Sequence, residues 1–261
     1  MDALCRAVLE RRFPLSFSIF DAHTHLGPAP KFPWVDWTSA GLIRRMDRLG
    51  IDRAAVSSLP GIFGQTRWGN EQVAQAQKQY PHRIIGYMTS DPGDPDTIET
   101  ELEYAYGLGL RAMKIYSYSF VPGLDYDHPN YAPIYAFANR HRMPVLVHTW
   151  GAEMDQLQEA FRQYPDIRWL CAHVGSRDLD KYVDSALKFP NVNLELCYSK
   201  CPKGLVEYLV REVPVEQIVW GSDQAFFDAA HQLGRVVFAE VPEAAKHAIL
   251  SGNAERIFST L

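Results

Sequence analysis

Short apolar runs alternate with longer amphipathic segments along almost the whole chain. Eight of these runs are rich in β-branched and other apolar residues and have the length of a buried strand. Because a helix-like segment follows each run, the pattern predicts parallel strands joined by helical crossovers. We expect the strands at residues 18–26, 53–59, 83–90, 110–118, 144–150, 167–175, 192–199 and 217–226.

The segments between the runs carry the usual helix signals. Leu42, Met46 and Leu49 recur at helical spacing, and Gly50 stands where that helix would end. Other segments stop before a proline such as Pro81, because the residue before proline avoids the helical conformation. We expect helices at residues 38–49, 70–80, 96–106, 131–141, 154–164, 179–188, 203–211 and 227–240.

Eight strand–helix pairs in 261 residues predict a closed (β/α)8 barrel. An open, doubly wound sheet is the alternative with the same alternation. No linker or low-complexity segment interrupts the pattern, so we expect residues 1–261 to form a single domain. In a (β/α)8 barrel the active site lies at the C-terminal ends of the strands.

Composition excludes several classes of protein. The net charge is −5 with scattered Lys and Arg residues, which predicts neither nucleic acid nor an anionic membrane as a partner. The apolar stretch at residues 13–20 is short and lacks a small-residue cleavage site, so we interpret it as part of the first strand and not as a signal peptide. The cysteines form no CxxC motif, which favours a cytoplasmic location with buried thiols; metal binding by the last two is the alternative. They are Cys5, Cys171, Cys197 and Cys201.

Residues able to bind metal stand at the ends of several predicted strands. His23 and His25 are one residue apart at the end of the first run, so their side chains should point to the same side. The strand ends of a barrel meet at one mouth, where we expect these groups to converge. Imidazoles and a carboxylate are the ligands expected for zinc or a similar divalent ion. The other candidates, on the fourth, fifth, sixth and eighth runs, are Lys114, His148, His173 and Asp223.

The order of these motifs resembles the amidohydrolase superfamily. The resemblance is closest to the branch called amidohydrolase family 2, which contains metal-dependent hydrolases and related decarboxylases, and it spans the chain from the first strand to the C-terminal helix. The motifs that carry it are Asp21-x-His23-x-His25, Lys114, His148, His173, Trp220-Gly-Ser-Asp223 and Gly252-Asn-Ala-Glu-Arg256.

The resemblance implies one or two divalent ions, most simply zinc. His23, His25 and Asp223 would hold the first ion. His148 and His173 would hold a second ion or contribute to a mononuclear site.

Lys114 would be carboxylated and bridge the ions in a binuclear member of the superfamily. As a free amine beside a cation it would instead be neutral or turned toward a substrate anion. A structural lysine paired with an acid such as Glu195 is the alternative.

The expected chemistry is activation of a water molecule by the metal, which lowers the pKa of that water toward about 7. Asp223 would accept the water's proton and pass it to the leaving group, and His173 would assist a developing oxyanion. A purely ligating Asp223 is the alternative, and the two roles are compatible.

Substrate contacts should come from the loops after the strands. These loops are rich in aromatic residues, which predicts an apolar or ring-bearing substrate, although some of the rings would only pack the loops onto the barrel. Arg67 and Arg177 are candidate anchors for a substrate carboxylate; exposed arginines without a ligand are the alternative. The aromatic candidates are Trp34, Trp37, Phe63, Trp68, Tyr116, Tyr118, Phe120, Tyr126 and Trp150.

These observations favour a metal-dependent hydrolase that cleaves an ester, lactone or amide of a small, carboxylated or ring-bearing molecule. The alternative is a metal-dependent decarboxylase of a cyclic or aromatic acid. A barrel that binds metal or ligand without turnover is a third hypothesis. The expected partners are a small-molecule substrate and a second copy of the chain in a homodimer.

Overall fold

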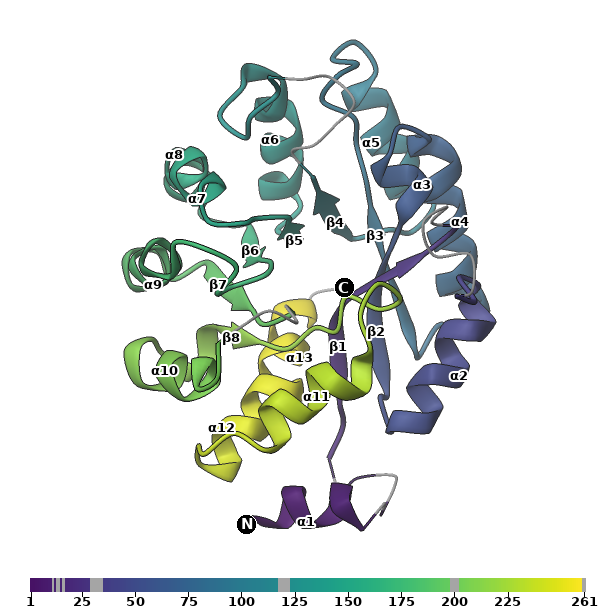
Figure 1. The fold of residues 1–261 in the computed structure, drawn as a ribbon. Coiled ribbons are helices and arrows are strands. Elements are labelled where there is room, and N and C mark those ends of the chain that lie inside the picture. The colour runs from purple at the N-terminus through teal and green to yellow at the C-terminus, as the bar shows by residue number, and fades with distance from the viewer. Residues whose placement is uncertain are drawn as a thin grey trace.

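Eight parallel strands form the centre of the computed structural model, which describes residues 1–10, 12, 15, 17–28, 35–116, 123–197 and 202–259. Each strand is hydrogen-bonded to the next in chain order. The helices lie on the outside of this ring of strands (Figure 1). The strands are β1 (Phe20–Leu26), β2 (Arg53–Ser58), β3 (Ile84–Met88), β4 (Ala112–Ile115), β5 (Pro144–Val147), β6 (Arg168–Cys171), β7 (Val192–Glu195) and β8 (Ile218–Val219).

Hydrogen bonds between β1 and the segment around β8 close the ring. The Ala22 N–H donates to Trp220 O at 3.2 Å, and the Asp223 N–H donates to His23 O at 2.7 Å. The fold is therefore a (β/α)8 barrel, as the sequence predicts, and the open-sheet alternative is wrong. Each strand lies inside its predicted run, but most end earlier than predicted.

The helices that cover the barrel also follow the predicted pattern. Thr38 caps the first of them by accepting from the Gly41 N–H, and Gly50 ends it with a left-handed φ of 66°. The segment predicted at 154–164 is two short helices. The helices after β1 to β8 are α2 (Ser39–Leu49), α3 (Leu59–Ile62) with α4 (Thr66–Gln79), α5 (Ile98–Gly107), α6 (Ala132–Arg140), α7 (Glu153–Gln156) with α8 (Gln158–Gln163), α9 (Leu179–Lys188), α10 (Leu205–Glu212) and α11 (Ala229–Val237).

The C-terminal helix α13 (Asn253–Phe258) closes the end of the barrel where the strands begin. Phe258 packs against Phe20, with ring centroids 5.0 Å apart, and Arg168 donates to Ile257 O from the start of β6. Before it lie the short helix α12 (Glu243–His247) and the π-helical turn η3 (Ala248–Gly252). Since this end is filled, the opposite end is left for a site.

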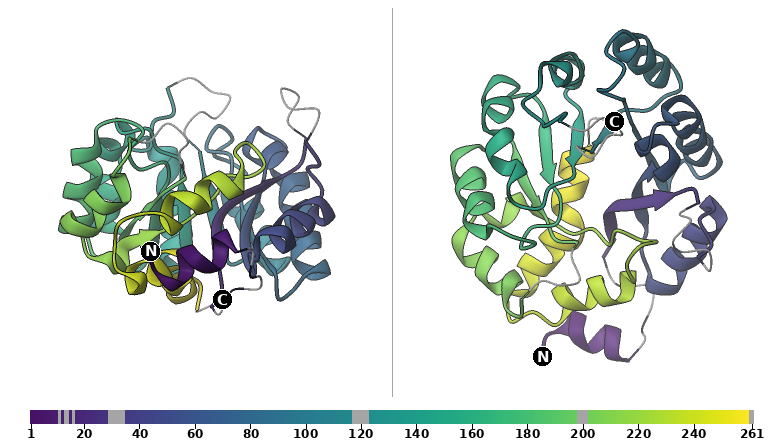
Figure 2. Two further views of the ribbon diagram at one scale, coloured as in Figure 1. Left: turned by 60° about the horizontal axis from the view of Figure 1, so that its bottom comes forward. Right: turned by 45° about the horizontal axis from the view of Figure 1, so that its top comes forward.

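Helix α1 (Ala3–Leu9) lies against the last helices, on the outside of the barrel (Figure 2). The side chain of Lys246 on α12 is buried and donates to Val237 O at 2.6 Å and to the Asp2 carboxylate at 2.6 Å. Asp2 also caps α1 by accepting from the Cys5 N–H at 2.8 Å. Among the residues that the structure describes, no helix is long and apolar enough to cross a membrane.

Replacement of Asp2 by Asn should lower the free energy of unfolding at pH 7 by about 1–3 kcal/mol, because the buried Lys246 ammonium loses its charged partner. The Cys5 N–H and the Lys246 ammonium hold the pKa of Asp2 well below its usual range. The stability that these two interactions add is therefore present above the ordinary Asp pKa of about 4, and it is lost as the pH falls below that value. Urea titrations should show a gap between the two proteins at pH 7 that narrows in acid.

Asp155→Asn is the control, because Asp155 pairs with Lys181 at 2.6 Å on the exposed surface. This substitution should lower the free energy of unfolding by less than about 1 kcal/mol. An equal cost for both variants would contradict the role given to the buried pair.

Candidate metal centre

Two histidines of β1 and an aspartate after β8 meet inside the open end of the barrel. Asp223 Oδ1 lies 2.9 Å from His25 Nε2 and 3.6 Å from His23 Nε2. All three side chains are almost completely buried. The predicted HxH motif therefore points inward, and its Nε2 atoms face the carboxylate.

The other three predicted residues join this group from neighbouring strands. Lys114 Nζ on β4 lies 3.1 Å from His23 Nε2. His148 follows β5 and His173 follows β6, and His173 Nε2 lies 3.1 Å from His148 Nδ1. The six residues that the sequence singles out for metal chemistry thus form one cluster.

Unusual backbone conformations place two of these residues. His173 has a φ of 63° and Asp223 a φ of 54°, in the left-handed region that residues other than glycine rarely adopt. Such conformations cost free energy and concentrate at functional sites. Here they turn the chain out of β6 and β8 at the residue whose side chain enters the cluster.

The surroundings of His25 fit a bound cation. Ser57 Oγ lies 2.8 Å from His25 Nδ1, and a hydroxyl can donate to this nitrogen or accept from it. Burial lowers the pKa of His25, which favours the neutral ring. The Asp223 carboxylate accepts from His25 Nε2 at 2.9 Å, and a divalent cation that replaced this hydrogen would contact both groups.

Asp223 is held as a carboxylate. Burial raises its pKa, but the electrostatic interaction with the nearby imidazoles of His23 and His25 and the hydrogen bond from His25 outweigh burial and hold the pKa well below its usual range. Neutral imidazoles with an ionised carboxylate match a divalent metal, so the residues present fit the ion that the sequence predicts.

Lys114 is buried, and burial lowers its pKa to about 8. The acid suggested as its structural partner, Glu195, accepts from the Nδ1 side of His23 at 3.1 Å, whereas Lys114 contacts the Nε2 side. Lys114 therefore belongs to the inner cluster. Its carboxylation stays a prediction.

Glu195 and Cys197, at the end of β7, are the residues that the sequence analysis undervalued. Cys197 Sγ lies 3.0 Å from His23 Nδ1, and donor atoms of His23, His173, Cys197 and Asp223 all lie within 4.8 Å of one another. The thiol is buried, as expected, but it adjoins the metal cluster. The sequence does contain a signal for Glu195, because it is a charged residue inside an apolar strand run. Cys201 lies outside the described residues.

A cavity of about 300 Å³ opens beside the cluster. One side carries the predicted metal residues, and the rest is apolar or aromatic. The Trp150 ring stacks on His173 with centroids 4.7 Å apart, and Tyr116 meets His148 edge-on at 4.4 Å. The lining residues are His25, Leu59, Ile62, Phe63, Lys114, Tyr116, His148, Trp150, His173, Asp223, Phe226 and Phe227.

The two predicted carboxylate anchors lie outside this cavity. Arg67 on α4 pairs with Glu101 at 2.6 Å and covers the ring of Tyr104. Arg177 is exposed in the loop before α9. Among the described residues that line the cavity, Lys114 is the only lysine or arginine.

The remaining aromatic candidates differ in where they lie relative to the site. Tyr126 is buried and donates its hydroxyl to His148 O at 2.7 Å, so it supports the site from behind. Trp68 is exposed. Trp34, Tyr118 and Phe120 lie outside the described residues.

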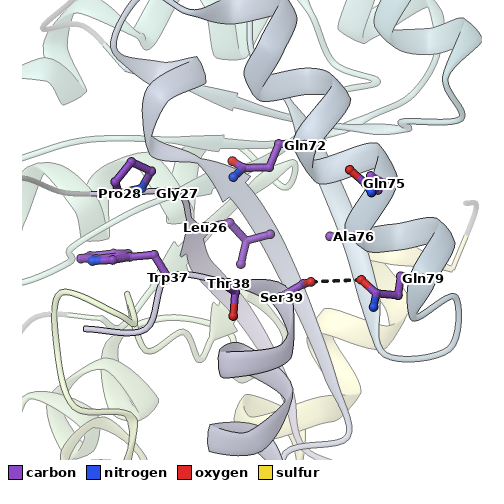
Figure 3. A pocket seen from close by; sticks show the side chains of 10 residues that line it. All are labelled: Leu26, Gly27, Pro28, Trp37, Thr38, Ser39, Gln72, Gln75, Ala76 and Gln79. Carbon is purple, nitrogen blue, oxygen red and sulfur yellow. Dashed lines mark hydrogen bonds between the residues drawn. The ribbon is translucent and has the colours of Figure 1, made fainter. Parts of the chain in front are cut away.

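A larger cavity of about 410 Å³ lies apart from the cluster, between the start of α2 and one face of α4 (Figure 3). Trp37 forms one wall, and the glutamine side chains of α4 form the other. Ser39 donates to Gln79 across it at 3.2 Å. None of the predicted metal residues lines it, so we assign the chemistry to the smaller cavity.

A (β/α)8 barrel with imidazoles, a carboxylate and a lysine at its open end has the architecture of a metal-dependent barrel enzyme. Residues 20–260 match the model of the amidohydrolase family, and the chain belongs to that family.

Solved structures with the same fold are similar over almost their whole length. A 5-carboxyvanillate decarboxylase from Sphingomonas paucimobilis is 17% identical, with a TM-score of 0.74 over 94% of this chain and 99% of that chain. A dihydroxybenzoic acid decarboxylase from Polaromonas sp. JS666, solved with manganese and the inhibitor 2-nitroresorcinol, is 17% identical, with a TM-score of 0.76 over 93% and 97%. A 4-oxalomesaconate hydratase from Rhodopseudomonas palustris is 18% identical, with a TM-score of 0.72 over 92% and 95%.

Gly221→Ala should destabilise the protein by about 1–3 kcal/mol and reduce its metal content. A Cβ atom at this position would lie 2.3 Å from Glu195 Oε1 and 2.6 Å from His23 Cβ, both in the packed interior. Thermal unfolding and metal analysis of the purified variant measure the two effects. Gly107→Ala is the control, because nothing lies within 4 Å of its added Cβ. Wild-type stability and metal content in Gly221→Ala would contradict the assigned packing.

Proposed function

We propose that this chain is a metal-dependent decarboxylase of a small aromatic carboxylic acid. The observation that carries the proposal is the cavity of about 300 Å³, which has the metal cluster on one side and mainly aromatic and aliphatic side chains around it. Its volume is at the small end of the range for ligand sites, about 300–1,000 Å³, which suits a substrate with a single ring. Two of the similar solved structures are decarboxylases of aromatic acids.

The walls of the cavity suit a flat ring. Trp150 and Tyr116 stand beside the imidazoles of His173 and His148, and Phe226 meets the His25 ring edge-on at 5.5 Å. A ring bound between these side chains would exclude water from the cluster and hold its carboxylate toward the polar side. The hydrolase hypothesis ranked first on sequence grounds, but these apolar walls favour the decarboxylase.

Lys114 supplies the positive charge for the substrate. Its side chain lines the cavity beside the cluster, and we assign it to pair with a carboxylate or phenolate oxygen of the substrate. This role replaces the one predicted for Arg67 and Arg177.

His23, His25 and Asp223 would hold the metal, with His148 and His173 beside it. When bound, the divalent ion supplies positive charge that stabilises negative charge on a substrate oxygen. The donor set suits zinc as predicted and equally manganese, which one of the similar structures contains.

The reaction exchanges a carboxylate for a proton: ArCOO⁻ + H⁺ gives ArH + CO₂. The bond between the ring carbon and the carboxylate breaks, and its electron pair takes the proton. We assign proton delivery to the pair His148 and His173, whose facing nitrogens lie 3.1 Å apart and share one hydrogen. Asp223, held as a carboxylate, is assigned as a metal ligand; the proton-acceptor role expected for hydrolysis has no step in this reaction.

The test is a panel of hydroxybenzoates and related aromatic acids, offered to manganese- and zinc-loaded protein, with CO₂ release and loss of substrate absorbance as readouts. Esters, lactones and amides of the same acids form the second panel. CO₂ release supports the proposal. Turnover of the second panel alone would establish the hydrolase, and no turnover of either would favour a binding protein.

Asp223→Asn should lower kcat at least about 100-fold while the protein stays folded, because it removes the ionised carboxylate at nearly constant volume. Initial rates and circular dichroism measure the two effects. Asp184→Asn, on the exposed face of α9, is the control. Near-wild-type activity of Asp223→Asn would contradict the site.

His23→Ala should lower the metal content of the purified protein, because it removes a ligand from the centre of the cluster. Mass spectrometry of metal per chain is the measurement. An unchanged content would show that the HxH motif does not bind the ion.

A further inference from the structure

A buried carboxylate and a thiol lie behind the metal cluster, on the side of the imidazoles that faces away from the cavity. Glu195 Oε1 accepts from the Cys197 N–H at 2.8 Å, and Oε2 accepts from the His173 N–H at 3.4 Å. Backbone N–H groups can only donate, so Glu195 is placed here as an acceptor. Its side chain is fully buried, and the room for it depends on Gly221.

The same carboxylate determines the protonation of His23. Oε2 lies 3.1 Å from His23 Nδ1, and since it accepts, Nδ1 carries the hydrogen. The lone pair of His23 is then on Nε2, which lies 3.6 Å from Asp223 Oδ1.

The backbone carbonyl of Cys197 determines the position of the hydrogen on His173 in the same way. His173 Nδ1 lies 2.8 Å from Cys197 O, which can only accept. Nδ1 therefore carries the hydrogen here too, and Nε2 faces His148.

Cys197 links the two imidazoles. Its N–H holds Glu195, its carbonyl holds His173, and its sulfur lies 3.0 Å from His23 Nδ1 and 3.2 Å from His173 Nδ1. The thiol hydrogen points to Glu195 Oε2 at 2.8 Å. For the sulfur to bind a metal together with these Nδ1 atoms, both rings would have to give up the hydrogens that Glu195 and Cys197 O accept.

We propose that Glu195 and Cys197 are positioning residues, which fix His23 and His173 with hydrogen on Nδ1 and direct the Nε2 lone pair of each ring into the metal cluster, and that Cys197 itself does not bind the metal. The inference rests on the metal site of the proposed function and not on the reaction. Carboxylates that accept from ligating histidines fix ring orientation and raise ligand basicity, and their loss typically costs 10- to 100-fold in metal affinity.

The first experiment measures the tautomers directly, by nitrogen NMR of the wild-type protein with ¹⁵N-labelled histidine. We expect hydrogen on Nδ1 of both His23 and His173, with assignments from single His→Gln variants. Hydrogen on Nε2 of either ring in the metal-free protein would overturn the proposal.

The second experiment measures metal affinity by competition with a chelator. Glu195→Gln should bind Mn²⁺ about 10- to 100-fold more weakly, because the amide must keep its oxygen toward the Cys197 N–H and so turns its NH₂ group toward His23 Nδ1. His23 should then move its hydrogen to Nε2, and the NMR spectrum reports that change independently of activity. Glu153→Gln is the matched control: Glu153 is also buried and accepts from the Trp150 N–H at 2.8 Å, away from the imidazoles. Equal affinities for wild type and Glu195→Gln would overturn the proposal.

The third experiment separates positioning from ligation at Cys197. Cobalt-substituted wild-type protein should lack a thiolate-to-metal charge-transfer band, and Cys197→Ser should change cobalt affinity less than about 10-fold. A band that disappears in Cys197→Ser would make Cys197 a ligand and overturn the assignment. Protein that binds metal as expected but releases no CO₂ would contradict the proposed function and leave this inference standing.

Discussion

The closure between β1 and the segment after β8 is the constraint on which the site depends. The Asp223 N–H bonds to His23 O, and the His25 N–H bonds to Gln224 O, each at 2.7 Å. These two bonds bring residues about 200 positions apart in the chain into one cluster. Without them, the HxH motif and its carboxylate would lie on opposite edges of an open sheet.

Asp21 strengthens this closure from behind. Its buried carboxylate accepts from the Ser222 N–H at 2.9 Å, from the Ser222 hydroxyl at 2.5 Å and from the Gln224 side chain at 3.2 Å. The first residue of the Asp-x-His-x-His motif thus holds the loop that carries Asp223, while the histidines face it. Motif residues at the two ends of the chain are therefore parts of one hydrogen-bonded unit.

The sequence predicts the barrel well because its signals are local and repeated. Apolar runs of strand length and helix ends such as Gly50 recur eight times, and each constrains its neighbours. The strand ends are predicted less well, because nothing in the sequence around His173 or Asp223 signals a left-handed φ, which tertiary contacts impose. The clustering of the six candidate metal residues is predicted because they stand at equivalent strand ends.

Predictions that depend on long-range pairing were less successful. Arg67 looks like an anion anchor in its loop, but Glu101, 34 residues later, occupies its guanidinium. Glu195 looks like a partner for Lys114, because both are charged residues in apolar strands. Only the three-dimensional arrangement shows that His23 lies between them, with Lys114 at Nε2 and Glu195 at Nδ1.

The position of His23 between these groups separates two faces of the cluster in this chain. The inner face carries the side chains to which we assign the metal, and the outer face carries Glu195 and Cys197, to which we assign their orientation. Neither face indicates which substrate is bound, so that information must come from what surrounds the cluster. In this chain Trp150, Tyr116 and Phe226 surround it, and aromatic walls of this kind suit a planar ring. The proposal of decarboxylation rather than hydrolysis therefore rests on the loops around the cluster, since the strand motifs fit both reactions.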